Sequence, residues 1–181
     1  ITTASKAMNS PADLKGFKIR VPGIPMWLSM FKALGAAPTA IPFGELYTAL
    51  QTKVVDGQEN PLALIQSAKL YEVQKFCAMT GHTWDGHFIF GNAKKLQALP
   101  REVQDLLAKH LHDAAVKQRE DIARLNRDAE AVLTKAGVSF SHPDTTPFRE
   151  MLRTAGFYTE WKGKFGDDAW AKLEKYAGRL A

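Results

Sequence analysis

The stretch that decides the fold of this chain runs from residue 18 to residue 61. It reads KIRVP (residues 18–22), GAAPTAIPFGELYTALQTKVVDG (35–57) and QENP (58–61). Pro and Gly in these segments mark points where a strand ends or a helix begins. In open α/β folds, ligands bind just outside the carboxyl ends of the strands. Four residues near these points, Arg20, Phe43, Glu59 and Asn60, are therefore candidates to line one small-molecule pocket.

Arg20 is suited to an acidic ligand. Its planar guanidinium donates two parallel hydrogen bonds to a carboxylate and does not deprotonate. Phe43 offers an aromatic ring, and Asn60 a carboxamide beside the Glu59 carboxylate. Each residue also has a simpler interpretation, as a surface arginine after a strand, a core phenylalanine or a helix-capping asparagine. The residues by themselves leave both interpretations open.

Strand and helix patterns alternate on both sides of this stretch. Strand patterns lie at residues 1–5, 17–22, 38–42, 76–82, 87–92 and 138–143, with an extended segment at 54–60. Helix patterns lie at residues 10–16, 25–34, 43–53 and 61–73, and two more follow Pro147. Such alternation with short connections predicts an α/β fold with a largely parallel sheet flanked by helices.

One predicted helix, at residues 100–136, differs in kind from the others. No Gly or Pro follows Pro100 until Gly137, and apolar residues recur at helical spacing. The stripe consists of Val103, Leu106, Leu107, Leu111, Ala114, Ala115, Ile122, Leu125, Ala129, Val132 and Leu133. A helix of this length would extend about 50 Å at 1.5 Å per residue, which predicts that it bridges two packed bodies. A coiled coil and a pair of helices with an unmarked kink are the alternatives.

The composition excludes several classes of function. Of the 181 residues, 45% are hydrophobic and 24% charged, as is ordinary for a globular protein, and no apolar run is long enough to span a membrane. The net charge of +5 is spread among acidic residues, so we expect no nucleic-acid partner. The single cysteine, Cys77, lies in an apolar run and is predicted to be buried. The first 16 residues lack signal-peptide features and the sequence does not begin with Met, so we expect a mature or cut chain.

Catalytic and metal-binding patterns are missing from the sequence. It contains no HExxH or paired CxxC motif, no GxSxG and no phosphate-binding glycine loop. His82 and His87 lack a third ligand, and His110 and His112 would point to different helix faces, so we expect no metal site and no cofactor. Trp84 and Asp85 follow a predicted strand, and the Trp84 ring is either a ligand-stacking surface or a plug at the sheet end. We include both as candidate ligand-binding residues.

The chain resembles the DctP-type substrate-binding proteins of TRAP (tripartite ATP-independent periplasmic) transporters. The resemblance rests on an ordered set of segments: DLKGFKIRVP, LGAAPTAIPFGELYTALQTKVVDGQENP, YEVQKF, TGH, ALP and GVSFSHPD. It implies a non-catalytic periplasmic receptor that delivers an organic acid to TRAP membrane permease subunits. Arg20 falls on the arginine that pairs with the ligand carboxylate, Phe43 on the aromatic that packs over the ligand, and Asn60, beside Glu59, on the asparagine that reaches it.

The resemblance also implies a two-lobed, type II periplasmic binding protein-like fold, of which this chain is the C-terminal portion. One lobe would comprise residues 1–85 and 126–181. Residues 86–125 would supply part of the other lobe and a helix that crosses the hinge, and the N-terminal part of that lobe would be absent. Lys53 departs from the family pattern, because many members have Gly or Asn there.

Two other functions stay open at this point. A small α/β enzyme acting on an organic acid would use Asp85 or Glu59 as its base, and an interaction module would be built on the long helix. The truncated chain itself is expected to self-associate, to retain a cleaved N-terminal piece or to rearrange residues 86–125. The sequence does not name the acid, although Trp27, Phe43 and Trp84 favour an aromatic or bulky apolar acid over a small dicarboxylate.

Overall fold

The computed structural model describes residues 1–84, 86 and 88–181. In these residues a six-stranded sheet has the order β3-β2-β4-β1-β5-β6. Its strands are β1 (Thr2–Thr3), β2 (Lys18–Val21), β3 (Ala37–Ala40), β4 (Gly57–Gln58), β5 (Phe76–Ala78) and β6 (Ser139–Ser141). β1 runs antiparallel to β4 and β5, whereas the other neighbouring pairs are parallel. The predicted α/β fold is confirmed. The sheet is mixed, because β1 runs antiparallel to both of its neighbours.

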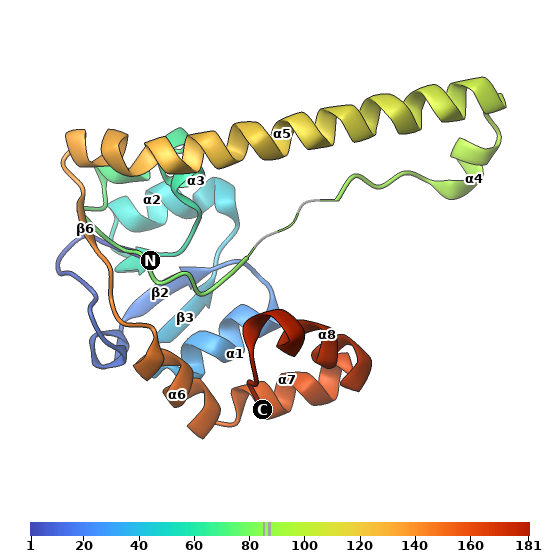
Figure 1. The fold of residues 1–181 in the computed structure, drawn as a ribbon. Coiled ribbons are helices and arrows are strands. Elements are labelled where there is room, and N and C mark those ends of the chain that lie inside the picture. Colours follow the sequence, from blue (N-terminus) through green and yellow to red (C-terminus); the bar gives the residue numbers. More distant parts are fainter. Residues whose placement is uncertain (85, 87) are drawn as a thin grey trace.

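Helices cover both faces of this sheet (Figure 1). The helices of the described residues are α1 (Pro25–Ala33), α2 (Leu46–Gln51), α3 (Leu62–Ser67), α4 (Ala93–Gln97), α5 (Arg101–Lys135), α6 (Thr146–Thr154), α7 (Phe157–Phe165) and α8 (Asp167–Ala177), with 3-10 turns η1 (Pro11–Leu14), η2 (Phe43–Glu45) and η3 (Leu70–Glu72). One face carries α1, α6, α7 and α8, and the other carries α2, α3 and the C-terminal end of α5.

Each face has its own hydrophobic core. Phe31 of α1 packs in one core with Phe148 of α6, and Leu133 of α5 packs in the other with Ile65 of α3. The sheet between them is tight at Gly57, where an added Cβ would lie 2.1 Å from the Thr2 carbonyl oxygen. Only glycine therefore lets β4 lie against β1 at this point.

The strand predicted at residues 87–92 is not formed. Residues 88–92 belong to no strand, and His87 lies outside the described residues. A strand needs a neighbour to accept and donate its backbone hydrogen bonds, and this segment passes away from the sheet towards α4 (Figure 1). Phe88, Ile89 and Phe90 are exposed along it.

Two helix predictions need correction. The helix predicted at residues 61–73 is divided into α3 and η3, because Lys69 adopts a left-handed backbone conformation with a φ of 53°. After Pro147 the chain forms α6, α7 and α8 in place of two helices. Gly156 and Gly166, with φ of 75° and 81°, separate these helices, whereas Gly163 lies inside α7.

The long helix is confirmed as the continuous helix α5, so the alternative with a kink is wrong. Its buried residues are Ala129 and Leu133, near its C-terminal end. Leu106, Leu107 and Leu111, in the predicted stripe, are exposed because this half extends away from the sheet (Figure 1). Among the helices of the described residues, none combines the length and the apolar character that a membrane crossing requires.

Candidate functional site

The candidate residues gather at one edge of the sheet. Because β2, β3, β4 and β5 run in one direction, the segments that follow them emerge together. Phe43 comes after β3, Glu59 and Asn60 after β4, and His82 after β5. Arg20 lies within β2, opposite Gln58 of β4 in the strand register.

Arg20 is almost fully buried, with 4% of its surface exposed. Its Nε donates a hydrogen bond to the Ile41 carbonyl oxygen over 2.7 Å, and its Cζ lies 5.9 Å from the centroid of the Phe43 ring. Within the described residues, no carboxylate forms an ion pair with it. Burial lowers the pKa of Arg20, and the negative charge of Glu59 opposes that shift. An arginine nonetheless stays protonated in proteins, so the edge of the sheet holds a cation with donors to spare.

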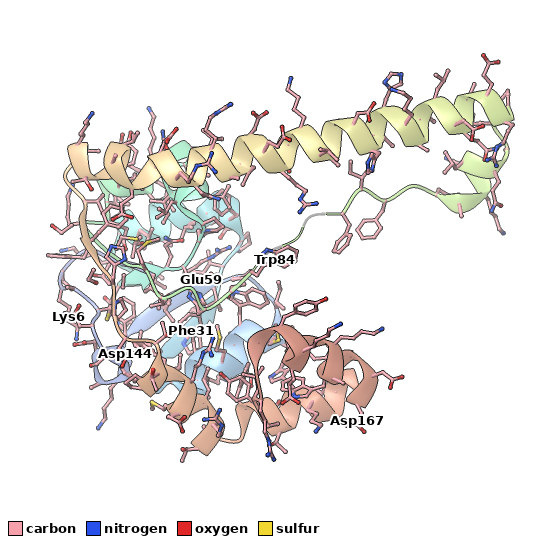
Figure 2. All side chains as sticks on the ribbon, in the orientation of Figure 1. Lys6, Phe31, Glu59, Trp84, Asp144 and Asp167 are labelled. Atoms are coloured by element: carbon pink, nitrogen blue, oxygen red, sulfur yellow. The ribbon has the colours of Figure 1, made fainter. Side chains whose placement is uncertain are left out.

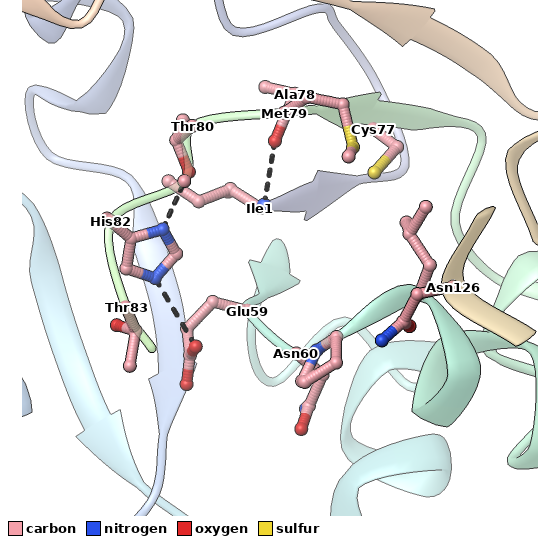
Figure 3. A pocket seen from close by; sticks show the side chains of 13 residues that line it. Ile1, Glu59, Asn60, Cys77, Ala78, Met79, Thr80, His82, Thr83 and Asn126 are labelled. Carbon is pink, nitrogen blue, oxygen red and sulfur yellow. Dashed lines mark hydrogen bonds and ion pairs between the residues drawn. The ribbon is translucent and has the colours of Figure 1, made fainter. Parts of the chain in front are cut away.

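Glu59 and His82 form a second polar group at this edge (Figure 3). Glu59 is 6% exposed, and its Oε2 lies 3.3 Å from Nε2 of His82. The other ring nitrogen of His82, Nδ1, lies 2.6 Å from the Thr80 hydroxyl. Phe31 meets the imidazole edge to face, with ring centroids 5.6 Å apart. The imidazole is therefore held on three sides.

Asn60 is oriented by a chain of side-chain amides. Its Nδ2 donates to Oε1 of Gln58 over 2.5 Å, and Nε2 of Gln58 donates to the Thr2 hydroxyl over 2.8 Å. Gln58 is fully buried, so this chain of hydrogen bonds is shielded from water. One N–H of the Asn60 side chain is therefore already hydrogen-bonded. The side-chain carbonyl oxygen of Asn60 has no partner in the described part of the chain.

A cavity of about 260 Å³ opens beside these groups. Its lining includes the polar side chains of Glu59, Asn60, Thr80, His82 and Asn126 (Figure 3). Glu59 and Asn60, which are adjacent in the sequence, both line this cavity, and Arg20 packs with Phe43. Arg20 and Phe43 do not themselves line the cavity.

A second cavity of about 440 Å³ lies on the other side of His82. Its remaining wall is mostly apolar, with Phe31, Leu152 and Leu180 among its residues, and it shares with the first cavity Ile1, Met79, Thr80, Gly81 and His82. The sequence predicted no site here.

Of the last two candidates, the structure describes only Trp84. Trp84 is 86% exposed (Figure 2), and Asp85 lies outside the described residues. Sequence reasoning missed Thr80 and Asn126, and it weighed His82 only as a metal ligand. The signal was present, because the TGH motif (residues 80–82) ends a predicted strand. In the part of the chain that the structure describes, no three His, Cys, Asp or Glu side chains are placed to hold a metal.

Known proteins resemble this chain in sequence and in fold. The model of the bacterial extracellular solute-binding protein family 7, DctP, matches residues 1–159. The sialic acid-binding periplasmic protein SiaP of Vibrio cholerae is 34% identical over 95% of this chain and 53% of its own length. The 2,3-diketo-L-gulonate-binding periplasmic protein YiaO of Escherichia coli is 37% identical over 76% of this chain and 42% of its own length.

A solved structure agrees with these matches. The TRAP periplasmic solute-binding protein of a Polaromonas species, bound to D-erythronate, superposes with a TM-score of 0.89 at 28% identity. That superposition covers 96% of this chain and 57% of the Polaromonas chain. The chain thus spans about half the length of the relatives it matches. By sequence and by fold, the chain belongs to the DctP family of bacterial extracellular solute-binding proteins, family 7.

Proposed function

We propose that the full-length protein containing this chain is a periplasmic receptor that binds a carboxylate-bearing organic acid and delivers it to a TRAP membrane permease. The observation that carries this proposal is Arg20, a buried cation at the carboxyl edge of the sheet whose remaining N–H donors have no partner among the described residues. The relatives support it, since sialic acid, 2,3-diketo-L-gulonate and D-erythronate are all carboxylic acids. The family consists of solute-binding proteins rather than enzymes.

In this proposal each residue has one task. The Arg20 guanidinium pairs with the ligand carboxylate, because two N–H groups can donate to its two oxygens. Phe43, which is 43% exposed, supplies an apolar cover over the ligand. The second N–H of Asn60 donates to the ligand, and Glu59 lines the cavity beside it.

The ligand is proposed to lie between two lobes. Residues 1–85 and 126–181 form one, and residues 86–125 belong mainly to the other. Two observations support the boundary at residue 126: the Asn126 side chain accepts a hydrogen bond from the Ala63 backbone N–H over 3.2 Å, while Leu106 and Leu111 are exposed. Closure would bend the chain where α5 passes from one lobe to the other.

An enzymatic function is the second candidate. Thr80, His82 and Glu59 form a hydroxyl–imidazole–carboxylate arrangement of the kind used in nucleophilic catalysis. A receptor returns its ligand unchanged, whereas an enzyme converts it. Mass spectrometry of a bound acid before and after prolonged incubation separates the two, and any product would favour the enzyme.

Replacement of the cation tests the receptor proposal. Arg20→Ala in the full-length protein should weaken binding of the acid retained through purification by about 2–5 kcal/mol, or roughly 30-fold to several thousand-fold, because a buried carboxylate loses its partner. Isothermal titration calorimetry measures this loss. Arg124→Ala, an exposed arginine on α5, is the matched control and should bind normally. Unchanged affinity in Arg20→Ala would show the proposal to be wrong.

A further inference from the structure

The second cavity lies within the helical face formed by α1, α6, α7 and α8 (Figure 1). All four helices or the segments that follow them contribute to its walls, together with the segment after β5. Protein interiors are normally packed without voids much larger than a water molecule, so a space of about 440 Å³ in this core is unusual. It falls within the range of about 300–1,000 Å³ that is typical of small-molecule sites.

The inner part of this cavity is apolar. Phe31 of α1, Leu152 of α6 and Leu180 after α8 line it, and all three are buried. Thr80 and His82 also line it, but the Thr80 hydroxyl is already paired with Nδ1 of His82. A hydroxylated ligand would bury polar groups here without partners, which costs binding free energy. An aliphatic chain would only remove apolar surface from water, and that is favourable.

The outer part carries a positive charge. Arg149 of α6 lines the cavity and is exposed, so it lies where the cavity meets the solvent. Among the described residues that line the cavity there is no Asp or Glu, and within the described part of the chain no carboxylate forms an ion pair with Arg149. An anionic group is therefore the charge that complements this mouth.

The Tyr158 hydroxyl adds a donor beside Arg149. It has no hydrogen-bond partner among the described residues, and it is not one of their sealed, unpartnered atoms. Burial raises the pKa of Tyr158, and the positive charge of Arg149 opposes that shift, which places the guanidinium within electrostatic reach of the phenol. A tyrosine with a raised pKa keeps its proton at neutral pH, so the hydroxyl can donate to an anion.

We propose that this cavity is a second binding site, separate from the proposed acid site, for an amphiphile with an aliphatic chain and one anionic head group. The chain occupies the space between Phe31, Leu152 and Leu180, and the head group lies between Arg149 and Tyr158. A fatty acid carboxylate is the simplest molecule of this class. The chain supplies most of the affinity, because an ion pair at an exposed mouth strengthens binding by about fivefold or less.

Fatty acids of increasing length test the proposal on the full-length protein. Octanoate, decanoate and dodecanoate are titrated by isothermal titration calorimetry below the concentrations at which they form micelles. One molecule should bind per chain. The affinity should rise about fourfold with each CH₂ that enters the cavity, as the free energy of burying a methylene requires. The alcohols 1-octanol and 1-decanol should bind about fivefold more weakly than the carboxylates of the same length. Absence of saturable binding, or equal binding of the alcohols, would overturn the proposal.

Substitutions locate the site. Ala177→Leu adds a larger side chain to the lining and should weaken decanoate binding by about tenfold or more, because it occupies room that the chain needs. Ala171→Leu, at an exposed position of the same helix, is the matched control and should bind normally. Unchanged decanoate affinity in Ala177→Leu, with a normal melting curve, would contradict the assignment.

The head group is tested separately. Arg149→Gln changes an exposed side chain, so the fold is kept even if Ala177→Leu is destabilised, and it should remove the preference for the carboxylate over the alcohol. A preference that persists in Arg149→Gln would overturn the role of this arginine. Arg20→Ala should bind decanoate like the wild type, because Arg20 lies outside the lining of this cavity. The result is therefore independent of the receptor function, and loss of decanoate binding in Arg20→Ala would show that the two sites are one.

Discussion

At the scale of single residues, Lys53 stands out by its backbone conformation. Its φ of 59° lies in the left-handed region, which non-glycine residues occupy at a cost of about 1–2 kcal/mol, with asparagine the best tolerated exception. The residue follows α2, where the chain turns sharply and the Val54 N–H bonds back to the Ala49 carbonyl oxygen. The left-handed turn would account for the Gly or Asn that the family resemblance implies at this position.

This conformation predicts that Lys53→Asn stabilises the protein. The expected gain is about 0.5–1 kcal/mol, which corresponds to roughly 1–4 °C in melting temperature for a chain of this size. Differential scanning calorimetry measures it. Lys15→Asn is the control, because Lys15 has an ordinary φ of −59° and should gain nothing. An equal effect of both substitutions would mean that loss of the lysine charge, and not relief of backbone strain, causes the stabilisation.

At the scale of elements, α5 has two different halves. Leu133, in its last turns, is fully buried against the sheet, whereas Leu107, in its first half, is 38% exposed. Such an exposed apolar stripe on a helix normally packs against something. If the lobe boundary lies at residue 126 as proposed, the other lobe of the full-length protein covers this stripe.

Two leucine truncations separate the halves. In the 181-residue chain, Leu133→Ala should cost about 2–5 kcal/mol of unfolding free energy, because it leaves a cavity in the core, whereas Leu107→Ala should cost about 0.5 kcal/mol or less. In the full-length protein the cost of Leu107→Ala should rise towards that of a core truncation. Urea denaturation measures all four values. A neutral Leu107→Ala in both proteins would contradict the proposed packing of residues 86–125 on the other lobe.

At the scale of the whole molecule, the site should need both lobes. Affinity between lobes comes from contacts on two sides and from exclusion of water on closure. A ligand carboxylate bound in the open site would keep one side in water, where an ion pair contributes about 1 kcal/mol or less. The exposed segment with Phe88 and Phe90 and the apolar half of α5 also favour association with other chains.

We therefore expect the 181-residue chain alone to bind its acid weakly or not at all, and to self-associate. Calorimetry at high protein concentration and light scattering after size exclusion measure the two properties, with the full-length protein as the comparison. A monomeric chain with micromolar affinity for the acid would contradict both expectations.

The sequence by itself determined the features that depend on near neighbours. A run without Gly or Pro and with helical periodicity was enough for α5, and the burial of Cys77 followed from its apolar neighbours. The resemblance marked Arg20, Phe43, Glu59 and Asn60 for the edge of the sheet, and the structure gathers them there. Their roles in binding stay predictions.

Only the tertiary structure decided the rest. The apolar residues 88–92 form no strand, because no strand of the described residues lies beside them, and β1 pairs antiparallel with both of its neighbours, β4 and β5. His82 is held by Glu59, 23 residues away, and Gln58 by Thr2, 56 residues away, so neither contact leaves a local pattern. Periodicity and turn residues act over a few positions along the chain, whereas strand pairing and buried polar contacts join distant segments, and only folding brings those together.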